Sequence, residues 1–368
     1  MGAEATMGSD DSNGTATRSD HPVWAGLLGE WPIHDGLPGV DLGAVCAFAD
    51  ARDEARRLLA GEPALVPLVR RGALRVTGDD RIDFLQGQVS HDVRGLGAGG
   101  VREALLLDHR GRPQADVVIV RRERDVYVAV DDGRGAVVRA ALDAHVIFDQ
   151  VVIEPLDERL VSFVVSGPAA LAVLRDALAV DRLPEAPEAA TQVAWHGADV
   201  MLHARPRGLT AAVDVHVLSE HLAPLWSTLL AEGAVAIGER ALATARVAAG
   251  IAAAAAEGVD ALPQEAGLEA RVSYRKGCYL GQEIMARVEA RGNLRRSLAT
   301  LRLEAAPSLD DVGLVGDDGR KAGRLGTVAP WPDGHWTALA VVRDEFDVGA
   351  TLRTQAVAAR LVGRPDLR

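Results

Sequence analysis

The spacing of apolar and polar residues along this 368-residue chain follows two periods, one typical of helices and one of strands. Apolar residues three and four positions apart predict helices over 44–60, 81–89, 168–178, 219–232 and 237–250. Alternating residues or short apolar runs predict strands over 65–76, 102–107, 115–130, 160–165, 192–203 and 211–218. Helices and strands in no regular alternation are typical of an α+β fold.

The pattern changes near residue 296, beyond which strands dominate. Strand-like segments over 298–303, 312–315, 324–329, 336–342 and 351–362 predict a small β-barrel domain over 296–368. Residues 40–292 form the main folded region, in which strand, helix, two strands and helix over about 158–235 predict a ferredoxin-like subdomain. The alanine tract 252–256 offers no side-chain chemistry, and the small, polar first residues predict a disordered tail over 1–25.

Composition narrows the class of protein. With 48% apolar residues the chain is expected to be a soluble globular protein, and its formal net charge of -12 argues against direct binding of nucleic acid. The N-terminus lacks a secretory signal, and no apolar run approaches the roughly 20 residues that cross a bilayer. Cys46 and Cys278 are too few and too distant in sequence for a disulfide scaffold, so we expect a cytoplasmic protein without membrane contact.

A glycine pattern at residues 95–100 resembles a dinucleotide-binding fingerprint, G-x-G-x-x-G. The residues that follow are strand-like, so no helix N-terminus is expected there to receive a pyrophosphate. We therefore reject dinucleotide binding. The ten histidines show no spacing typical of a metal site, and two cysteines cannot supply the four thiolates of a common iron–sulfur cluster, so no resident metal is predicted.

The scarcest residue types gather in one run, Tyr274 to Met285. The chain has two lysines against thirty-eight arginines, and Lys276 lies in this run, two residues before Cys278. A helix is expected to begin near Gly281–Gln282, so its free N–H groups and dipole, with the Lys276 ammonium, favour a thiolate at Cys278. Cys278 and Lys276 are thus candidate catalytic residues, with Cys278 a nucleophile, redox centre or transient metal ligand; the alternative is an inert buried cysteine.

The run Lys276 to Glu283 resembles the signature of the YgfZ-type folate-binding proteins, which are relatives of the glycine-cleavage aminomethyltransferase. The resemblance includes the flanking residues Leu262 to Ala266, Arg287 and Arg291–Gly292. Residues 83–93 and 107–116 resemble the same family. The chain departs from the family pattern at Gly267, where asparagine is expected, and at the alanine tract.

This resemblance implies that residues 40–292 form an aminomethyltransferase-like region, arranged with the barrel as a ring of three parts around a pocket for tetrahydrofolate or another reduced folate. We expect the cofactor to be bound by residues of the motif and by acidic and basic residues outside it, because pterins bind to carboxylates and folate tails to arginine. The candidates are Tyr279, Gly281, Gln282, Glu283, Asp92, Asp108 and Arg246. Tyr279 could equally be an ordinary core tyrosine and Glu283 a helix cap, and most charged residues of this kind are simply solvated.

Two functions from different classes remain open. The resemblance implies an accessory protein that uses bound folate and Cys278 to support assembly or repair of iron–sulfur enzymes, with an indirect effect on tRNA modification; its partners would be those client enzymes or assembly factors. The alternative is a tetrahydrofolate-dependent one-carbon transferase, which moves an aminomethyl or methyl group. A transferase needs a carboxylate that relays a proton, and the sequence alone does not identify one.

Overall fold

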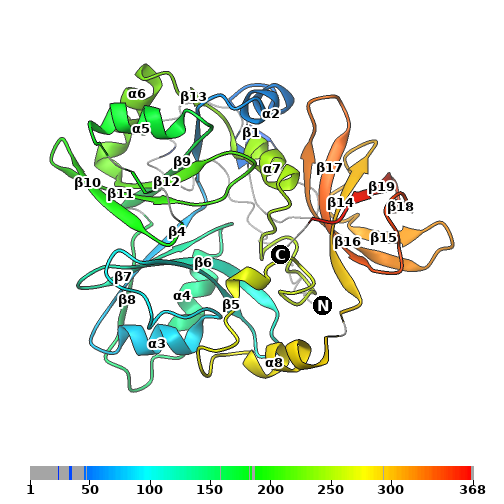
Figure 1. The fold of residues 1–368 in the computed structure, drawn as a ribbon, viewed down its shortest axis with the longest axis horizontal. Helices are drawn as coiled ribbons and strands as arrows, with labels where there is room; N and C mark the ends of the chain where they lie inside the picture. The colour runs from blue at the N-terminus through cyan, green and yellow to red at the C-terminus, as the bar shows by residue number, and fades with distance from the viewer. Residues whose placement is uncertain are drawn as a thin grey trace, which may run out of the picture.

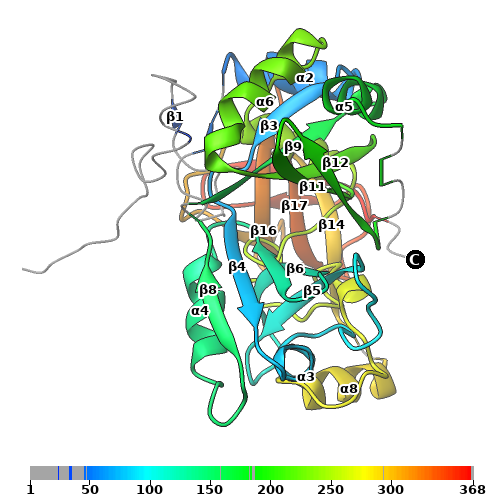
Figure 2. The same ribbon diagram turned by 90° about the vertical axis from the view of Figure 1, so that its left-hand side faces the viewer.

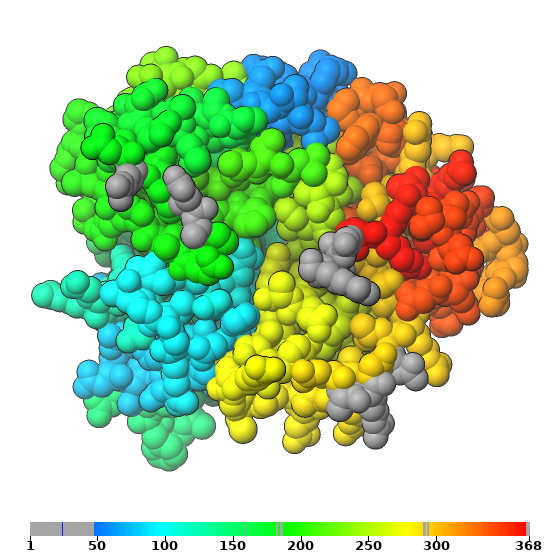
Figure 3. Space-filling model, in the orientation of Figure 1, coloured from blue at the N-terminus to red at the C-terminus, as the bar shows by residue number. Residues whose placement is uncertain are grey.

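The computed structural model describes residues 48–157, 159–181, 183–184, 187–292 and 294–365, together with Trp24, Ile33–His34 (β1) and Val45–Cys46 (β2). The tail predicted over 1–25 lies outside these residues, Trp24 excepted. Figure 1 shows three parts around a central coil: one sheet at the bottom, a second at the upper left and a barrel at the right. In the space-filling view of Figure 3 the three parts close on one another over this face. The mixed helix and strand content confirms the predicted fold class.

The first sheet has five antiparallel strands in the order β5-β6-β7-β4-β8. They are β4 (Gly72–Thr77), β5 (Val101–Leu107), β6 (Pro113–Arg121), β7 (Val126–Val130) and β8 (Val152–Pro155). Helices α3 (Arg81–Gln88) and α4 (Gly135–Asp143) cover one face, where Phe84 and Leu142 join a buried cluster with Ile119. Because β5 follows the glycine pattern at 95–100 directly, no helix is available there for a dinucleotide, as predicted.

The second sheet has six strands in the order β10-β11-β12-β9-β3-β13. They are β3 (Ala64–Pro67), β9 (Leu160–Ser166), β10 (Ala190–Trp195), β11 (Ala198–Ala204), β12 (Ala212–Leu218) and β13 (Val235–Ala236). Helices α5 (Ala170–Leu178) and α6 (Ser219–Ala231) pack on one face through Leu174 and Trp226. Helices α2 (Ala51–Leu59) and α7 (Glu239–Ala248) pack on the other through Leu58 and Ala241. Figure 2 shows α2, α5 and α6 at the top of the view.

Four predicted elements outside the barrel are wrong in extent. The strand expected over 115–130 is two antiparallel strands, β6 and β7, because residues 122–125 form a tight turn between them. The strand expected over 192–203 is two strands, because His196 and Gly197 both have positive φ (47° and 82°) and form the two-residue turn of a hairpin. The strand expected over 65–76 is also two, and these belong to different sheets. The helix expected over 44–60 begins only at Ala51, because the Asp50 side chain accepts hydrogen bonds from the N–H groups of Arg52 and Asp53 and caps it.

The C-terminal part is a closed barrel with strand order β14-β17-β16-β15-β18-β19. Its strands are β14 (Arg296–Leu303), β15 (Gly313–Gly316), β16 (Lys321–Pro330), β17 (Trp336–Arg343), β18 (Thr351–Arg353) and β19 (Ala358–Gly363). The predicted barrel is confirmed, although the strand expected over 351–362 is split, since Asp311 accepts the N–H groups of Gln355 and Ala356 and holds a turn there.

A coil from Ala249 to Gly281 crosses the centre and contains one 3-10 turn, η2 (Glu269–Arg271). It connects α7 to α8 (Gln282–Arg291), which begins at the residue predicted from the sequence. Alanines 252–256 of this coil are buried between the first sheet and the barrel, so their small size allows the three parts to approach. Within the described residues no helix is both long and apolar enough to cross a membrane.

Candidate functional site

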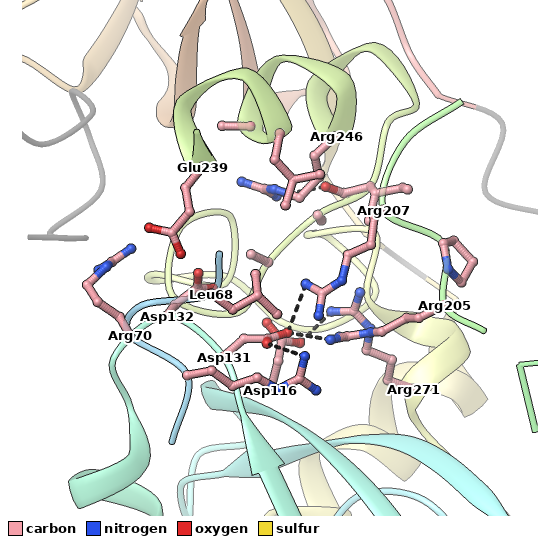
Figure 4. Close-up of a pocket in the computed structure, with 17 residues that line it drawn as sticks. Leu68, Arg70, Asp116, Asp131, Asp132, Arg205, Arg207, Glu239, Arg246 and Arg271 are labelled. Atoms are coloured by element: carbon pink, nitrogen blue, oxygen red, sulfur yellow. Dashed lines mark hydrogen bonds and ion pairs between the residues drawn. The ribbon is translucent and has the colours of Figure 1, made fainter. Parts of the chain in front are cut away.

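A polar pocket lies where the two sheets, α7 and the central coil meet (Figure 4). Its volume is about 90 Å³, and six arginines and four acidic residues are among the described residues that line it. The charged lining residues are Arg70, Arg71, Arg205, Arg207, Arg246, Arg271, Asp116, Asp131, Asp132 and Glu239. The apolar side is formed by α7 and by Ile251, Ala252 and Ala253 of the coil. The alanine tract, which was expected to offer no side-chain chemistry, thus shapes the pocket through its backbone and small side chains.

One end of the pocket is a network of buried ion pairs. Arg205 bonds to Asp131, and Arg207 donates to both oxygens of Asp214 at 3.0 and 2.6 Å. Arg71 also bonds to Asp214, which is 0% exposed. Burial opposes ionisation of Asp131 and Asp214, but the surrounding guanidinium groups outweigh it and hold both pKa values well below their usual range. This end is therefore a rigid, fully ionised wall.

A second set of pairs ties the central coil to the first sheet. Arg271 bonds to Asp116 and lies 3.2 Å from Glu103, while Asp116 also accepts the N–H of Ala254 at 2.6 Å. Burial opposes ionisation of Glu103, yet Arg205 and Arg271 lower its pKa to about 2. The coil is thus fixed on the pocket floor by charge-assisted hydrogen bonds.

The opposite end, where Figure 4 shows Arg70, Asp132 and Glu239 near one another, is less satisfied. The buried Oε2 atom of Glu239 and the buried Nε atom of Arg70 have no hydrogen-bond partner among the described residues. Burial raises the pKa of Glu239 to about 7, and Arg70 opposes this only in part. Burial and the charge of Asp131 also raise the pKa of Asp132, whose backbone has a positive φ of 58°. Unpaired buried polar atoms at a cavity wall indicate where a ligand would bind.

Behind the ion-pair wall lies a buried group with metal-ligand residue types, His203, Asp214 and His216, whose ligand atoms lie within 4.8 Å of one another. Arg71 and Arg207 already donate to Asp214, and a cation between them would be repelled. The His216 Nε2 and His203 Nδ1 atoms are 3.2 Å apart, and burial lowers the pKa of His203 to about 4, so the rings are neutral. We interpret this group as support for the pocket wall.

Of the site residues predicted from the sequence, Arg246 alone is among the described residues that line the pocket. Its guanidinium group donates to the Ile251 carbonyl at 2.7 Å and to Glu257 at 3.2 Å, and it also bonds to Thr327 of the barrel. Arg246 therefore joins α7, the coil and the barrel at the pocket edge.

The predicted motif lies elsewhere, beside the C-terminal end of α3 at the bottom of Figure 1. The Lys276 ammonium donates to the carbonyls of Gln86 and Val89, both at 2.5 Å, and of His91 at 3.0 Å. Burial lowers the pKa of Lys276 to about 8, and the charge of Asp92 opposes that shift. Lys276 thus replaces the missing helical donors at the end of α3.

Cys278 is exposed and lies three residues before Gly281, the residue that precedes α8. Among the described residues no hydrogen bond joins Cys278 to Lys276, whose ammonium donates to backbone carbonyls instead, so their chemical cooperation stays a prediction. Gly277 and Gly281 have φ values of 95° and 84°, in the left-handed region that favours glycine. A Cβ atom on Gly281 would lie 2.6 Å from the Asp108 carbonyl oxygen, whereas one on Gly277 would meet nothing within 4 Å.

The other predicted binding residues have local contacts. Tyr279 is 7% exposed, and its ring lies 5.0 Å from the Lys276 ammonium. Gln282 accepts the Tyr279 N–H at 3.3 Å, and Glu283 is exposed in the first turn of α8. Outside the motif, the Asp92 carboxylate accepts hydrogen bonds from the Gln86 side-chain amide at 2.9 Å and from the Gly95 N–H at 3.0 Å. Asp108 accepts the N–H groups of Arg110 and Arg112 in its own turn.

The residues that sequence reasoning missed are the charged pairs of the pocket. Asp131–Asp132 follow β7 directly and Arg205 and Arg207 follow β11, so one signal was present: charges immediately after apolar strands. Glu239 gave no such signal, because an acidic residue in the first turn of a helix is common for reasons of the helix dipole alone.

Comparison with known proteins identifies the fold. The family described as GCVT N-terminal domain matches residues 64–276, more than half of the chain. The crystal structure of glycine cleavage system aminomethyltransferase T from Bartonella henselae is similar to this chain with a TM-score of 0.76 at 16% identity, over 94% of this chain and 96% of that one. Heterotetrameric sarcosine oxidase from Corynebacterium sp. U-96 overlaps 50% of this chain and 94% of that chain at 17% identity, with a TM-score of 0.34.

Proposed function

The chain belongs to the family of the GCVT N-terminal domain, and we propose that it binds a reduced folate such as tetrahydrofolate in the arginine-lined pocket. The observation that supports this most is the unsatisfied end of the pocket. The unpaired Glu239 oxygen can accept N–H groups of a pterin, and Arg70 can bind a carboxylate. The whole-chain similarity in fold to an aminomethyltransferase agrees with this choice of ligand class.

The size of the pocket limits how the ligand fits. A volume of about 90 Å³ is below the roughly 300 Å³ at the lower end of small-molecule pockets. Only part of a folate fits within it as it stands, so the remainder must lie outside or displace side chains. Arg70 is the arginine expected to move, because its side chain has no hydrogen bond or ion pair to another described residue, whereas Arg205 and Arg207 are held by carboxylates.

Calorimetric titration with tetrahydrofolate tests the binding. We expect a saturable heat for the wild-type protein and roughly tenfold weaker binding for Arg70→Gln, because one charge-assisted hydrogen bond contributes about 1.5 kcal/mol or more. Arg110→Gln, which removes an exposed arginine of a surface turn, is the matched control and should bind as wild type does. Absence of heat for the wild-type protein at millimolar ligand would remove the folate assignment.

We propose further that the protein acts as a YgfZ-type accessory factor in the cytoplasm, and that Cys278 acts on a partner protein that carries an iron–sulfur cluster. Cys278 is exposed on a glycine-flanked loop, where a protein surface can reach it. Cys278→Ser should leave stability within about 0.5 kcal/mol, since an exposed thiol has few packing contacts. The same variant should fail to restore iron–sulfur enzyme activity in cells that lack this protein. Full restoration by Cys278→Ser would exclude the thiol.

A second candidate, a folate-dependent one-carbon transferase, is favoured by Glu239. A carboxyl group with a pKa of about 7 can both give and accept a proton near neutral pH, as the transfer of a carbon unit to a folate nitrogen requires. The two candidates differ in which substitution matters. Glu239→Gln should abolish transfer from an aminomethyl donor in a purified assay if the protein is a transferase, whereas the accessory function should depend on Cys278.

A further inference from the structure

A second cavity lies between the central coil and one end of the barrel. Its volume is about 180 Å³, and it is separate from the arginine-lined pocket, with which it shares no lining residue. The described residues that line it come from the coil and from strands β14, β16 and β17: Ala256, Glu257, Val259, Asp260, Arg296, Lys321, Gly323, Arg324, Val341 and Arg343.

Two acidic residues line this cavity, and both are already engaged. Glu257 is 1% exposed, accepts the N–H groups of Ala253 and Thr327, both at 2.7 Å, and pairs with Arg246 on the side of the first pocket. Asp260 pairs with Arg112 at 2.8 Å. Among the described residues, neither carboxylate forms an ion pair with a cation of the cavity.

The cations, in contrast, lack partners. Lys321 and Arg324 form no ion pair within the part of the chain that the structure describes, and Arg343 lies 4.0 Å from Glu345, a weak contact between exposed groups. Only Arg296 is well paired, with Glu265 at 2.6 Å. The cavity therefore carries an excess of positive charge in a protein whose net charge is -12.

The strand register brings two of these cations close together. Arg296 of β14 and Arg343 of β17 are directly opposite one another, and like charges in that position destabilise a sheet. Arg324 is half-buried, and its guanidinium group has only carbonyl acceptors at 3.1 and 3.4 Å. Burial lowers the pKa of Arg324, and the nearby charges of Asp260 and Glu257 oppose this only in part, while neither carboxylate bonds to its guanidinium group. Lys321, Arg324 and Arg343, three cations with weak ion pairs or none, are thus held at one concave end of a barrel, which points to a bound anion.

We propose that this cavity binds a small polyanion, one that carries phosphate groups or several carboxylates, through Lys321, Arg324 and Arg343. Concave clusters of like charge concentrate counter-ions, and guanidinium groups bind phosphate and carboxylate with paired hydrogen bonds. The volume of about 180 Å³ limits the ligand to an ion of the size of pyrophosphate or citrate, well below drug-sized ligands of roughly 300 Å³ or more. The proposal does not depend on folate binding, because the two pockets have different walls.

Calorimetric titration of the full chain with pyrophosphate and with citrate, at ionic strength matched with sodium chloride, tests the site. The wild-type protein should bind at least one of them with 1:1 stoichiometry. Binding of pyrophosphate alone identifies a phosphate-bearing ligand, and binding of citrate alone identifies a polycarboxylate. Binding of both ions shows that the site recognises negative charge without distinguishing phosphate from carboxylate. No saturable heat from either ion would overturn the proposal.

A charge-matched pair of double variants locates the site. Lys321→Gln with Arg343→Gln removes two exposed cations of the cavity and should weaken binding roughly tenfold or more. Arg353→Gln with Arg360→Gln removes two exposed arginines from β18 and β19 of the same barrel, outside the cavity, and should leave affinity within about twofold. Equal weakening by the two pairs would show that net charge alone attracts the ion. Tetrahydrofolate titration of the first pair should match wild type, which separates this test from that of the folate pocket.

Discussion

Glu239→Gln should make the protein more stable at neutral pH, and by an amount that depends on pH. Burial raises the pKa of Glu239 from 4.5 to about 7, so the native state binds more protons than the unfolded chain between these two values. Stability is therefore lost as pH rises through this window. Glutamine is similar in shape to the protonated carboxyl and never ionises, so it removes the loss.

The magnitude follows from the two pKa values. The difference between 4.5 and about 7, at 1.36 kcal/mol per pKa unit, corresponds to a cost of about 3 kcal/mol that is complete above about pH 7. Near pH 5 the same relation gives a cost of ionising Glu239 in the native state of less than about 1 kcal/mol. The stabilisation by Glu239→Gln should thus grow by about 2 kcal/mol between pH 5 and pH 8, which for a chain of this length is a difference of a few degrees in Tm.

Thermal unfolding of wild type and Glu239→Gln at pH 5, 6, 7 and 8 measures this directly. Glu123→Gln, at an exposed turn, controls for the change of one charge and should show a difference that is nearly constant with pH. A Tm difference between wild type and Glu239→Gln that does not change with pH would refute the argument that burial at the pocket wall makes this carboxyl titrate near neutrality.

Two further predictions concern the motif. In urea titrations, Gly281→Ala should lower the free energy of unfolding by about 2–4 kcal/mol, because alanine is strained at this positive φ and its Cβ atom would overlap the Asp108 carbonyl. Gly277→Ala has the same backbone strain but no overlap, and it should lower the free energy of unfolding by about 1 kcal/mol. Lys276→Arg should lower Tm although it keeps the charge, since a planar guanidinium group cannot donate to three convergent carbonyls as an ammonium does; a wild-type Tm would mean that the lysine is not required for this contact.

The sequence predicted the elements whose signals are local. The start of α8 at Gln282 and the strands of the barrel follow from periodicity and from glycine and aspartate turns, and the structure places them there. The hairpin at His196–Gly197 was missed because a positive φ is uncommon at any residue other than glycine, so the run looked like one strand. Elements with ordinary turn residues are therefore predictable, and those with unusual backbone conformations are not.

The pocket could not be predicted, because its charged residues pair across distances of up to about 150 positions in the chain. Arg71 reaches Asp214, and Arg271 reaches Asp116. Each of these residues, taken alone, resembles a solvated surface charge. The statistical signal that we used was the rarity of a residue type, and it identified the run around Lys276, which donates to backbone carbonyls. It could not identify the pocket, because the pocket is lined by arginine, the commonest cation of this chain.

The separation of the exposed thiol from the pocket restricts the mechanisms that can combine them. Cys278 is outside the pocket lining and Lys276 is committed to three carbonyls at and just beyond the end of α3, so a thiol attack on a carbon unit carried by a pocket-bound folate has no support in this arrangement. The proposed function therefore requires two distinct contacts, a folate in the pocket and a partner protein at the α3–α8 edge. The central coil connects the two places, and the Asp116 bonds to Arg271 and Ala254 fix it to the first sheet, so coupling between the proposed ligands is expected to pass through this coil.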